Sequence, residues 1–315
     1  MLCSNLIRIV VQCRMCTKER KENMKTMFTA ALLLIAAAIA GCGGGGGSGS
    51  SVTGTTISGM VADGYLSGAE VFLDKNGTYQ WDGDEPRTTT DTNGAYSMTV
   101  SAADAARYPM VARVIAGTTI DKDTNSPVAS SYVMSAPAGM VGFISPMTTL
   151  IREKMAANPS MTMTDAMTQL RNQMNLPAGI DMMADYVAAS QSGGSAAHYQ
   201  TMHTVAQQMA GLMAGESAQV MTGSSVNVNR YRSMMATINT NMPGIAANAK
   251  NGLSMNSTFM TTMMSAMQSQ LGAIPMTGGF MNYSAMFRNM TSSGYFWNTN
   301  SGTTTPKTPM GGGMM

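Results

Sequence analysis

The amino-acid sequence predicts an α+β protein with an N-terminal β-sandwich followed by an α-helical domain, and three observations lead to this prediction. Residues 55–142 contain short runs of alternating polar and apolar residues between turn dipeptides. Residues 143–272 instead repeat apolar residues at the three- and four-residue spacing of a helix face. Residues 1–41 have the composition of a leader, so they are set apart from the fold.

The leader at residues 1–41 has the order of a secretory signal peptide. Basic residues between Lys18 and Lys25 precede an apolar run at 27–40, and small residues follow before Cys42. The apolar run is shorter than the ~20 residues that span a membrane, which favours cleavage. Two starts remain open, because translation from Met24 would leave a leader of ordinary length and place residues 1–23 upstream of it.

The end of the leader, Ile39-Ala40-Gly41-Cys42, resembles the lipobox of bacterial lipoproteins. The resemblance implies cleavage before Cys42 and fatty acylation of its thiol, for example with palmitate, so that the chain is held on a membrane of the cell envelope. Two or more acyl chains anchor a protein stably, whereas one is marginal. Gly43 differs from the aspartate of the inner-membrane retention signal, so the resemblance favours the outer membrane.

The region after the leader starts with a flexible linker and is nearly neutral in charge. Residues 42–54 carry the lipidation cysteine and the run GGGGGSGSS at 43–51, which is typical of a flexible coil. The whole chain has 19 basic and 17 acidic residues, and the leader holds six of the basic and two of the acidic ones. This balance argues against nucleic-acid binding.

The predicted β-sandwich occupies residues 55–142. Tyr96, Met98 and Val100 alternate with polar neighbours, as half-buried strands do, and Asp63-Gly64 and Asn93-Gly94 are turn dipeptides. Several short strands at this spacing predict a sandwich.

The stretch at 57–100, ISGMVADGYLSGAEVFLDKNGTYQWDGDEPRTTTDTNGAYSMTV, resembles the carboxypeptidase-regulatory and transthyretin-like β-sandwiches of bacterial surface proteins. The glycine-bounded start at 59–68, the VFLD strand, the acidic loop and the Asp91-x-Asn93-Gly94-x-Tyr96 turn carry this resemblance. The next segment, FISPMTTLI at 143–151, is similar to the junction that follows such modules in lipoproteins. The resemblance implies a fold and says almost nothing about a ligand.

The predicted helical domain, residues 143–272, has clear start signals. Ser145 followed by Pro146 predicts a helix through about Ala157, and Thr162 with Asp165 is a capping-box pattern. Further helices are expected at about 180–189, 196–215, 226–240 and 256–271. The Gly-, Thr- and Pro-rich tail at 273–315 is predicted to be largely irregular.

The acidic loop at 74–85 has the donor spacing of a calcium loop. Counted from Asp74, oxygen donors fall at positions 1, 3, 5, 7, 9 and 12, which are Asp74, Asn76, Thr78, the Gln80 carbonyl, Asp82 and Glu85. Tyr79 departs from the pattern, because it replaces the glycine of the sharp turn. Ca²⁺ binding and a solvated acidic hairpin are therefore both open, and the shorter D-x-D-x-N pattern at 121–125 predicts a polar turn.

Methionine is unusually abundant, with 36 residues in the chain. Two stripes at helical spacing stand out, together with two histidines: His198, Met202, His203, Met209, Met213, Met260, Met263, Met264 and Met267. Packing of a flexible apolar core explains such spacing. The alternatives are a soft-metal surface that binds Cu(I) or silver, and a buffer against oxidants.

The sequence gives little support for catalysis, since no nucleophile, P-loop or H-E-x-x-H motif appears. We therefore expect a lipid-anchored envelope protein with a non-catalytic binding or scaffolding role, whose partner is an envelope protein or a surface ligand. Soft-metal handling by the methionine stripes is the alternative.

Overall fold

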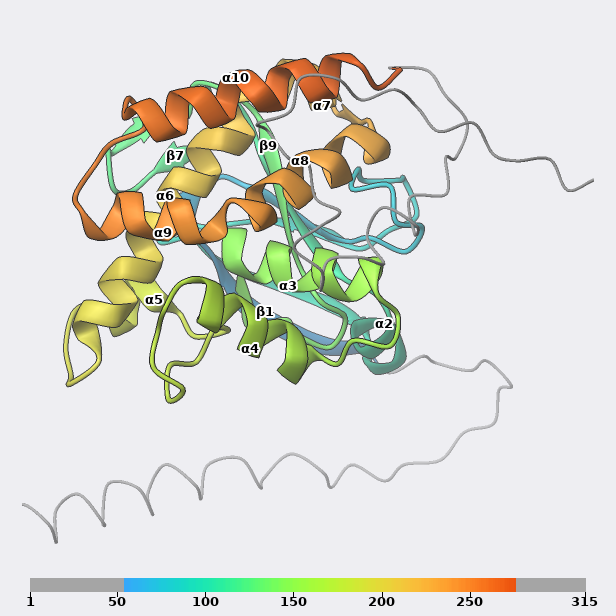
Figure 1. Ribbon diagram of the computed structural model, residues 1–315. Coiled ribbons are helices and arrows are strands. Elements are labelled where there is room, and N and C mark those ends of the chain that lie inside the picture. Colours follow the sequence, from blue (N-terminus) through green and yellow to red (C-terminus); the bar gives the residue numbers. More distant parts are fainter. Residues whose placement is uncertain (1–53, 276–315) are drawn as a thin grey trace, which may run out of the picture. The chain divides into compact units, whose positions relative to one another are not determined.

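The computed structural model describes residues 54–275 of the chain (Figure 1). The predicted leader, Cys42, nearly all of the linker and most of the tail at 273–315 lie outside the described residues. Within the described range both helices and strands occur, which confirms the mixed α+β class.

The strands form several small sheets. One has the order β10-β1-β5, in which β1 runs antiparallel to β5 and parallel to β10, and another has the order β4-β3-β6-β9 with antiparallel neighbours. Two smaller sheets have the orders β2-β7-β8 and β11-β12. The strand bounds are β1 Gly54–Val61, β2 Leu66–Ser67, β3 Glu70–Leu73, β4 Arg87–Thr89, β5 Ala95–Ser101, β6 Met110–Val114, β7 Ile120–Asp121, β8 Ser126–Pro127, β9 Tyr132–Ala136, β10 Phe143–Ile144, β11 Met221–Thr222 and β12 Ser225–Val226.

The two larger sheets differ in how they are buried. In β5 the buried residues Tyr96, Met98 and Val100 alternate with residues open to solvent, as the sequence predicts. Strand β9 is instead buried at all of its positions, and β3 and β6 are almost continuously buried. The four-stranded sheet is therefore covered on both faces, whereas the β10-β1-β5 sheet keeps one face open.

The helices are α2 Ala102–Arg107, α3 Pro146–Ala157, α4 Met163–Gln173, α5 Tyr186–Ala189, α6 Ala196–Gly215, α7 Ser217–Val220, α8 Val228–Thr240, α9 Met242–Lys250 and α10 Thr258–Gly272. The two predicted helix starts are confirmed, since Ser145 and Thr162 each accept a bond from the third residue of their helix in a complete capping box. The helix expected at 180–189 is wrong in extent, because Asp185 caps a helix of only four residues. Helices α2, α7 and α9 were not predicted.

Helix α3 holds the four-stranded sheet through a buried cluster of hydroxyls. The Ser135 amide of β9 donates to Thr149 Oγ1 at 2.8 Å, and Thr148 Oγ1 donates to the Ser135 carbonyl at 2.7 Å. Two phenols also bond to strand-region backbone carbonyls, Tyr231 of α8 to Val133 and Tyr186 of α5 to Ala62. Figure 1 shows α3 and α8 lying across the strands.

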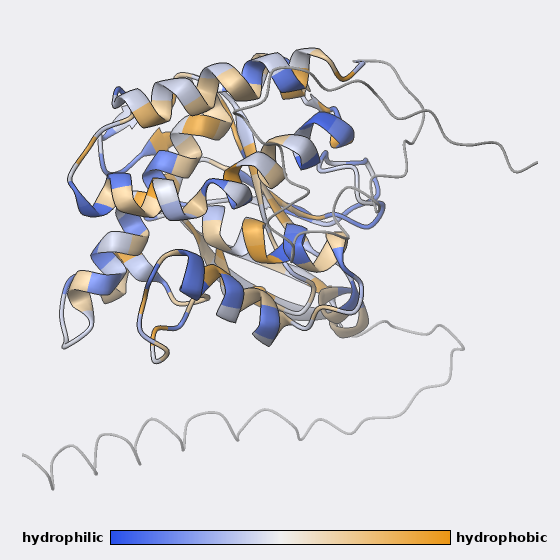
Figure 2. Ribbon diagram, in the orientation of Figure 1, coloured by the Kyte–Doolittle hydropathy of each residue, from blue (hydrophilic) through white to orange (hydrophobic). Residues whose placement is uncertain are grey.

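Strands and helices share one hydrophobic core. Buried residues of the region 55–142 and of the region 143–272 belong to the same apolar cluster, and both regions lie in one compact unit. In Figure 2 the longer helices carry apolar and hydrophilic residues side by side, as expected of helices that bury one face. Among the described helices, none combines the length and the apolar character needed to cross a membrane.

Candidate functional site

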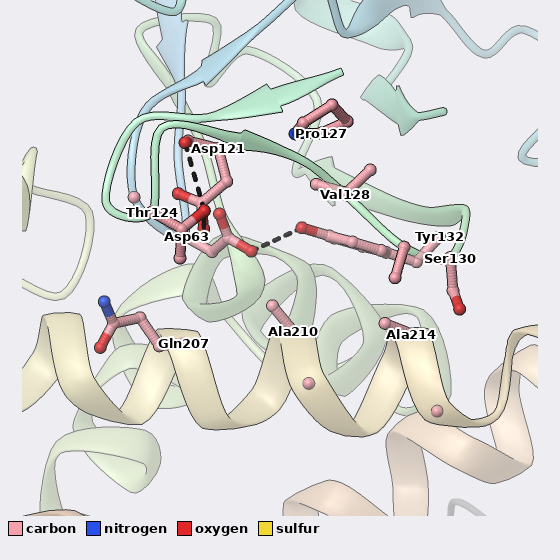
Figure 3. Close-up of a pocket in the computed structure, with 14 residues that line it drawn as sticks. Asp63, Asp121, Thr124, Pro127, Val128, Ser130, Tyr132, Gln207, Ala210 and Ala214 are labelled. Atoms are coloured by element: carbon pink, nitrogen blue, oxygen red, sulfur yellow. Dashed lines mark hydrogen bonds between the residues drawn. The ribbon is translucent and has the colours of Figure 1, made fainter. Parts of the chain in front are cut away.

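A pocket of about 350 Å³ lies between the β7–β8 hairpin, the start of β9 and helix α6, and we call it the Asp63 pocket (Figure 3). Its volume is at the lower end of the range of small-molecule sites. The lining residues are Asp63, Gly64, Asp121, Thr124, Pro127, Val128, Ala129, Ser130, Tyr132, Gln207, Ala210, Gly211, Ala214 and Gly215.

The turn after β1 brings Asp63 to this position. The Ala62 amide donates to the Ile144 carbonyl, and the Lys122 amide donates to the Tyr65 carbonyl, so the turn is fixed to β10 on one side and to the β7–β8 hairpin on the other. A Cβ at Gly64 would stand 2.3 Å from the Asp123 carboxylate, so any other residue here would displace that side chain. The Asp63-Gly64 dipeptide is thus a turn, as predicted, and also the floor of the pocket.

Asp63 is a buried carboxyl group with one oxygen left without a partner. Its side chain belongs to a residue only 8% exposed, and Oδ2 accepts a hydrogen bond from the Tyr132 hydroxyl at 2.5 Å. Oδ1 has no hydrogen-bond partner. Figure 3 shows the carboxyl group and the Tyr132 ring pointing toward each other across the space beside α6.

Burial raises the pKa of Asp63 to about 7, since the charged form loses its hydration. The hydrogen bond from Tyr132 and the backbone amide of Asp63 itself lower this pKa in part, whereas the nearby carboxylates of Asp121 and Asp123 raise it further. A carboxyl group with a strongly perturbed pKa in a pocket is a candidate for function.

The predicted polar turn at 121–125 is confirmed and forms one wall of the pocket. Asp121 Oδ1 accepts a bond from the Asp123 amide at 2.8 Å, and Asp121 Oδ2 accepts one from Thr124 Oγ1 at 3.1 Å. Asn125 adopts the left-handed conformation, with φ of 51°. The turn therefore satisfies its own acceptors while it presents Asp121 to the pocket.

Asp123 fastens this turn to helix α6. Its Oδ2 lies 2.7 Å from His203 Nε2 and accepts a bond from Gln207 Nε2, also at 2.7 Å. The bond to His203 holds the pKa of Asp123 below its usual range. The sequence places no acidic residue near His203, so only the fold supplies this partner, 80 residues away.

In the acidic loop, the two end positions are engaged by other groups. Asp74 Oδ2 forms an ion pair with Arg152 of α3 at 2.9 Å, and its Oδ1 accepts bonds from the Gly77 and Thr78 amides. Glu85 accepts bonds from two backbone amides, Oε1 from Lys75 and Oε2 from Asp82. Both carboxylates therefore help to hold the loop shut.

The four middle positions of the loop are close together. Thr78 Oγ1 lies 2.8 Å from Asn76 Oδ1, 3.2 Å from the Gln80 carbonyl and 3.3 Å from Asp82 Oδ2. A hard cation prefers such oxygens. The four are hydrogen-bonded to one another, with Asn76 Nδ2 also donating to Asp82 Oδ2 at 2.5 Å, so a calcium ion would replace these bonds and would draw Asp74 and Glu85 from their present partners. Within residues 54–275 no group of three or more His, Cys, Asp or Glu side chains is arranged to hold a metal ion.

Tyr79 makes the sharp turn for which calcium loops use glycine. Its φ is 60°, and the strain is offset by complete burial of the ring against Tyr231, with centroids 4.4 Å apart. The Tyr79 hydroxyl donates to Glu153 Oε1 at 2.6 Å, and the Arg152 guanidinium lies over the ring. The residue that departs from the loop pattern is thus an anchor that ties the loop to α3 and α8.

The methionine stripes lie almost entirely in the core. Met202, Met209, Met213, Met260, Met263 and Met267 are buried, and Met264 is half-buried. The two histidines are separate, since His203 is bonded to Asp123 while His198 stands half-buried one and a half turns earlier on α6. Packing accounts for the helical spacing of these thioethers.

Comparisons of the chain with protein-family models, with curated proteins and with solved structures gave no match.

Proposed function

We propose that this chain is a lipid-anchored protein of the cell envelope, held through Cys42 on the outer membrane, which acts by binding a ligand and not by catalysis. The anchor is supported by the lipobox-like sequence before Cys42, a residue outside the described range. The binding role is supported by one observation above all, the buried carboxyl group of Asp63 in the lining of a pocket, with its Oδ1 lacking a hydrogen-bond partner.

Binding is favoured over catalysis because Asp121 in the pocket lining and His203 next to it are already engaged. Both oxygens of Asp121 accept bonds from within their own turn, and His203 is committed to Asp123. A general base also needs an oriented partner to activate, and within the described residues we find no nucleophile held between a base and a third group at this pocket.

We further propose that residues 55–142 are a β-sandwich of the carboxypeptidase-regulatory type, with the β1-β5 pair and the β4-β3-β6-β9 sheet as its two layers and β10, at 143–144, added at the edge of the first. The alternating burial of β5 and the double-sided burial of β9 support this arrangement, because a sheet between another sheet and helices is covered twice. The sandwich would present the acidic loop and the Asp63 turn, and the helices would complete the pocket.

Acylation can be tested by growing cells that express the chain with a clickable palmitate analogue and by measuring the mass of the mature N-terminus. We expect label on a chain that starts at residue 42, and no label on Cys42→Ser. The matched control is Cys16→Ser, which removes a leader cysteine and should label normally. An unlabelled chain that keeps its leader would contradict the proposed anchor.

The binding role can be tested by native mass spectrometry of the chain released gently from envelopes. We expect an added small-molecule mass on the parent protein that is absent from Asp63→Asn and present on Asp84→Asn, which removes an exposed carboxylate outside the pocket. An identical mass on all three proteins would contradict a role for this pocket.

A further inference from the structure

We propose that the Asp63 pocket binds a small primary alkylammonium ion, whose N–H groups donate to the Asp63 carboxylate once its covered oxygen Oδ1 turns toward the pocket. This inference rests on the proposed binding function and names the chemical class of its ligand. It follows from the charge, the missing hydrogen bond and the apolar walls of the pocket.

The charge of the pocket calls for a cation. Asp63 and Asp121 both line it, and no lysine or arginine is found among its lining residues in the described part of the chain. A buried carboxylate is unfavourable unless a positive charge or hydrogen-bond donors compensate it. Tyr132 supplies one donor to Oδ2, so the compensation still lacking is at Oδ1.

The missing hydrogen bond selects a cation that carries N–H groups. An ammonium group has three donors, so it can donate to Asp63 Oδ1 and keep two N–H groups for other acceptors. A quaternary ammonium group has no N–H and is recognised by cages of aromatic rings, of which this pocket has only the Tyr132 ring. A transition metal would need His203 and Asp123, which are bonded to each other.

The remaining walls fit a short alkyl chain. Pro127 and Val128 lie on the hairpin side, and Ala210 and Ala214 of α6 lie opposite them, as Figure 3 shows. Small apolar side chains leave room for methylene groups and offer them no competing polar atoms. A short diamine matches both features, because one end can address Asp63 and the other Asp121, whose oxygens each accept one bond and keep a second lone pair, while the stem contacts the alanines.

The titratable groups around Asp63 come from four elements. Asp121 and Asp123 belong to the β7–β8 hairpin, Tyr132 to β9, Tyr186 to α5 and His203 to α6. Because the ligand needs Asp63 ionised, its affinity should rise as the pH passes 7 from below. At pH 5.5 a carboxyl group with a pKa of about 7 is ionised to roughly 3%, so binding should be roughly 30-fold weaker than at pH 8.

The test is calorimetric titration of the full mature chain, purified in detergent, with 1,4-diaminobutane. We expect saturable binding at pH 8, a loss of about 10-fold or more in affinity for Asp63→Asn, and no change for the control Asp84→Asn. Two probes separate shape from charge. The neutral isostere 1,4-butanediol tests the shape of the ligand alone, and Ca²⁺ tests its charge alone. The pH dependence of the parent protein keeps the test decisive if Asp63→Asn does not fold.

The proposal is overturned if the diamine gives no binding at pH 8, or if it binds Asp63→Asn as well as it binds the parent. Equal affinity for butanediol would overturn the ammonium class but leave the pocket as a binding site. Tighter binding of Ca²⁺ than of the diamine at this pocket would also overturn it. The acylation and native-mass experiments test the proposed function separately, so the two failures are distinguishable.

Discussion

Two buried aspartates, Asp74 in the acidic loop and Asp63 in the pocket, meet opposite surroundings. Asp74 is 1% exposed, and its oxygens are matched by the Arg152 guanidinium and by two loop amides. Asp63 is 8% exposed, and it has a single phenol as its partner. The loop resembles a metal-ion site in sequence, yet the positive charge next to Asp74 is the guanidinium of Arg152 on α3.

This difference separates a structural carboxylate from one that is available to a ligand. A buried charge that is paired holds the elements around it in place, and removal of its partner is costly. A buried charge without a partner lowers the stability of the ligand-free protein. The same charge is available to a ligand that compensates it. The loop is therefore expected to respond to loss of Arg152, and the pocket to pH and to ligand.

The largest effect should come from Arg152→Met, which leaves Asp74 buried without its counter-charge. We expect the free energy of unfolding at pH 7 to fall by about 3–5 kcal/mol, as found when one member of a buried ion pair is removed. Urea denaturation followed by circular dichroism measures this loss. The control Arg87→Met breaks a half-exposed pair with Glu70 and a contact with the Trp81 ring, and should cost no more than about 2 kcal/mol. Equal losses for the two variants would show that Arg152 is not what stabilises the loop.

The next effect should come from Asp63→Asn and should depend on pH. Because folding raises the pKa of Asp63 from 3.8 to about 7, its ionisation destabilises the folded state as the pH rises from about 4 to about 7. The full penalty above pH 7 is roughly 4 kcal/mol at most. Asp63→Asn should therefore be more stable than the parent at pH 8 by about 2–4 kcal/mol, and should show little gain at pH 4.

Urea titrations of the two proteins at a series of pH values measure this difference. Burial also raises the pKa of Glu216 to about 7, so the parent profile contains both groups and only the difference between the proteins reports Asp63. A difference that does not vary with pH would contradict the assignment.

The smallest effect should be that of calcium on the acidic loop. With Asp74 and Glu85 engaged, we expect the affinity at the weak end of extracellular sites, near 1 mM, so that 1 mM Ca²⁺ adds about 0.4 kcal/mol. In a calorimetric scan, 1 mM Ca²⁺ should raise the Tm of the parent protein slightly and should leave the Tm of Asp82→Asn unchanged. That variant removes a loop charge without touching the Arg152 pair, and no rise in the parent would count against calcium binding.

Local signals in the sequence predicted the helix starts better than the extents of the helices. The capping boxes at Ser145 and Thr162 are formed by residues three apart, so the sequence contains all of their atoms. Helix α9 is not among the predicted helices, and glycine is a poor helix former. The lack of a Cβ at Gly244 is what allows the Phe259 ring of α10 to approach. A long-range contact of this kind leaves no local pattern.

The pocket was missed for the same reason. Asp63 was recognised only as a turn residue, and its partner Tyr132 lies 69 residues further along the chain. His203 was considered for soft-metal binding, while the structure pairs it with Asp123. A signal was present in the Asp63-Gly64 turn and in the aspartate-rich turn at 121–125, but only the fold shows that the two turns line the same pocket.

The phenols of Tyr186 and Tyr231, which donate to the carbonyls of Ala62 and Val133, have a consequence for how this protein comes apart. Each forms a hydrogen bond from the second half of the polypeptide to the first, and both tyrosines are buried. Pulling the helices away would strip the strands of hydrogen-bond donors and of apolar cover in the same event. The two halves are thus expected to unfold together. A gene fragment that ends near residue 142, where the predicted β-sandwich region ends, would encode an incomplete molecule.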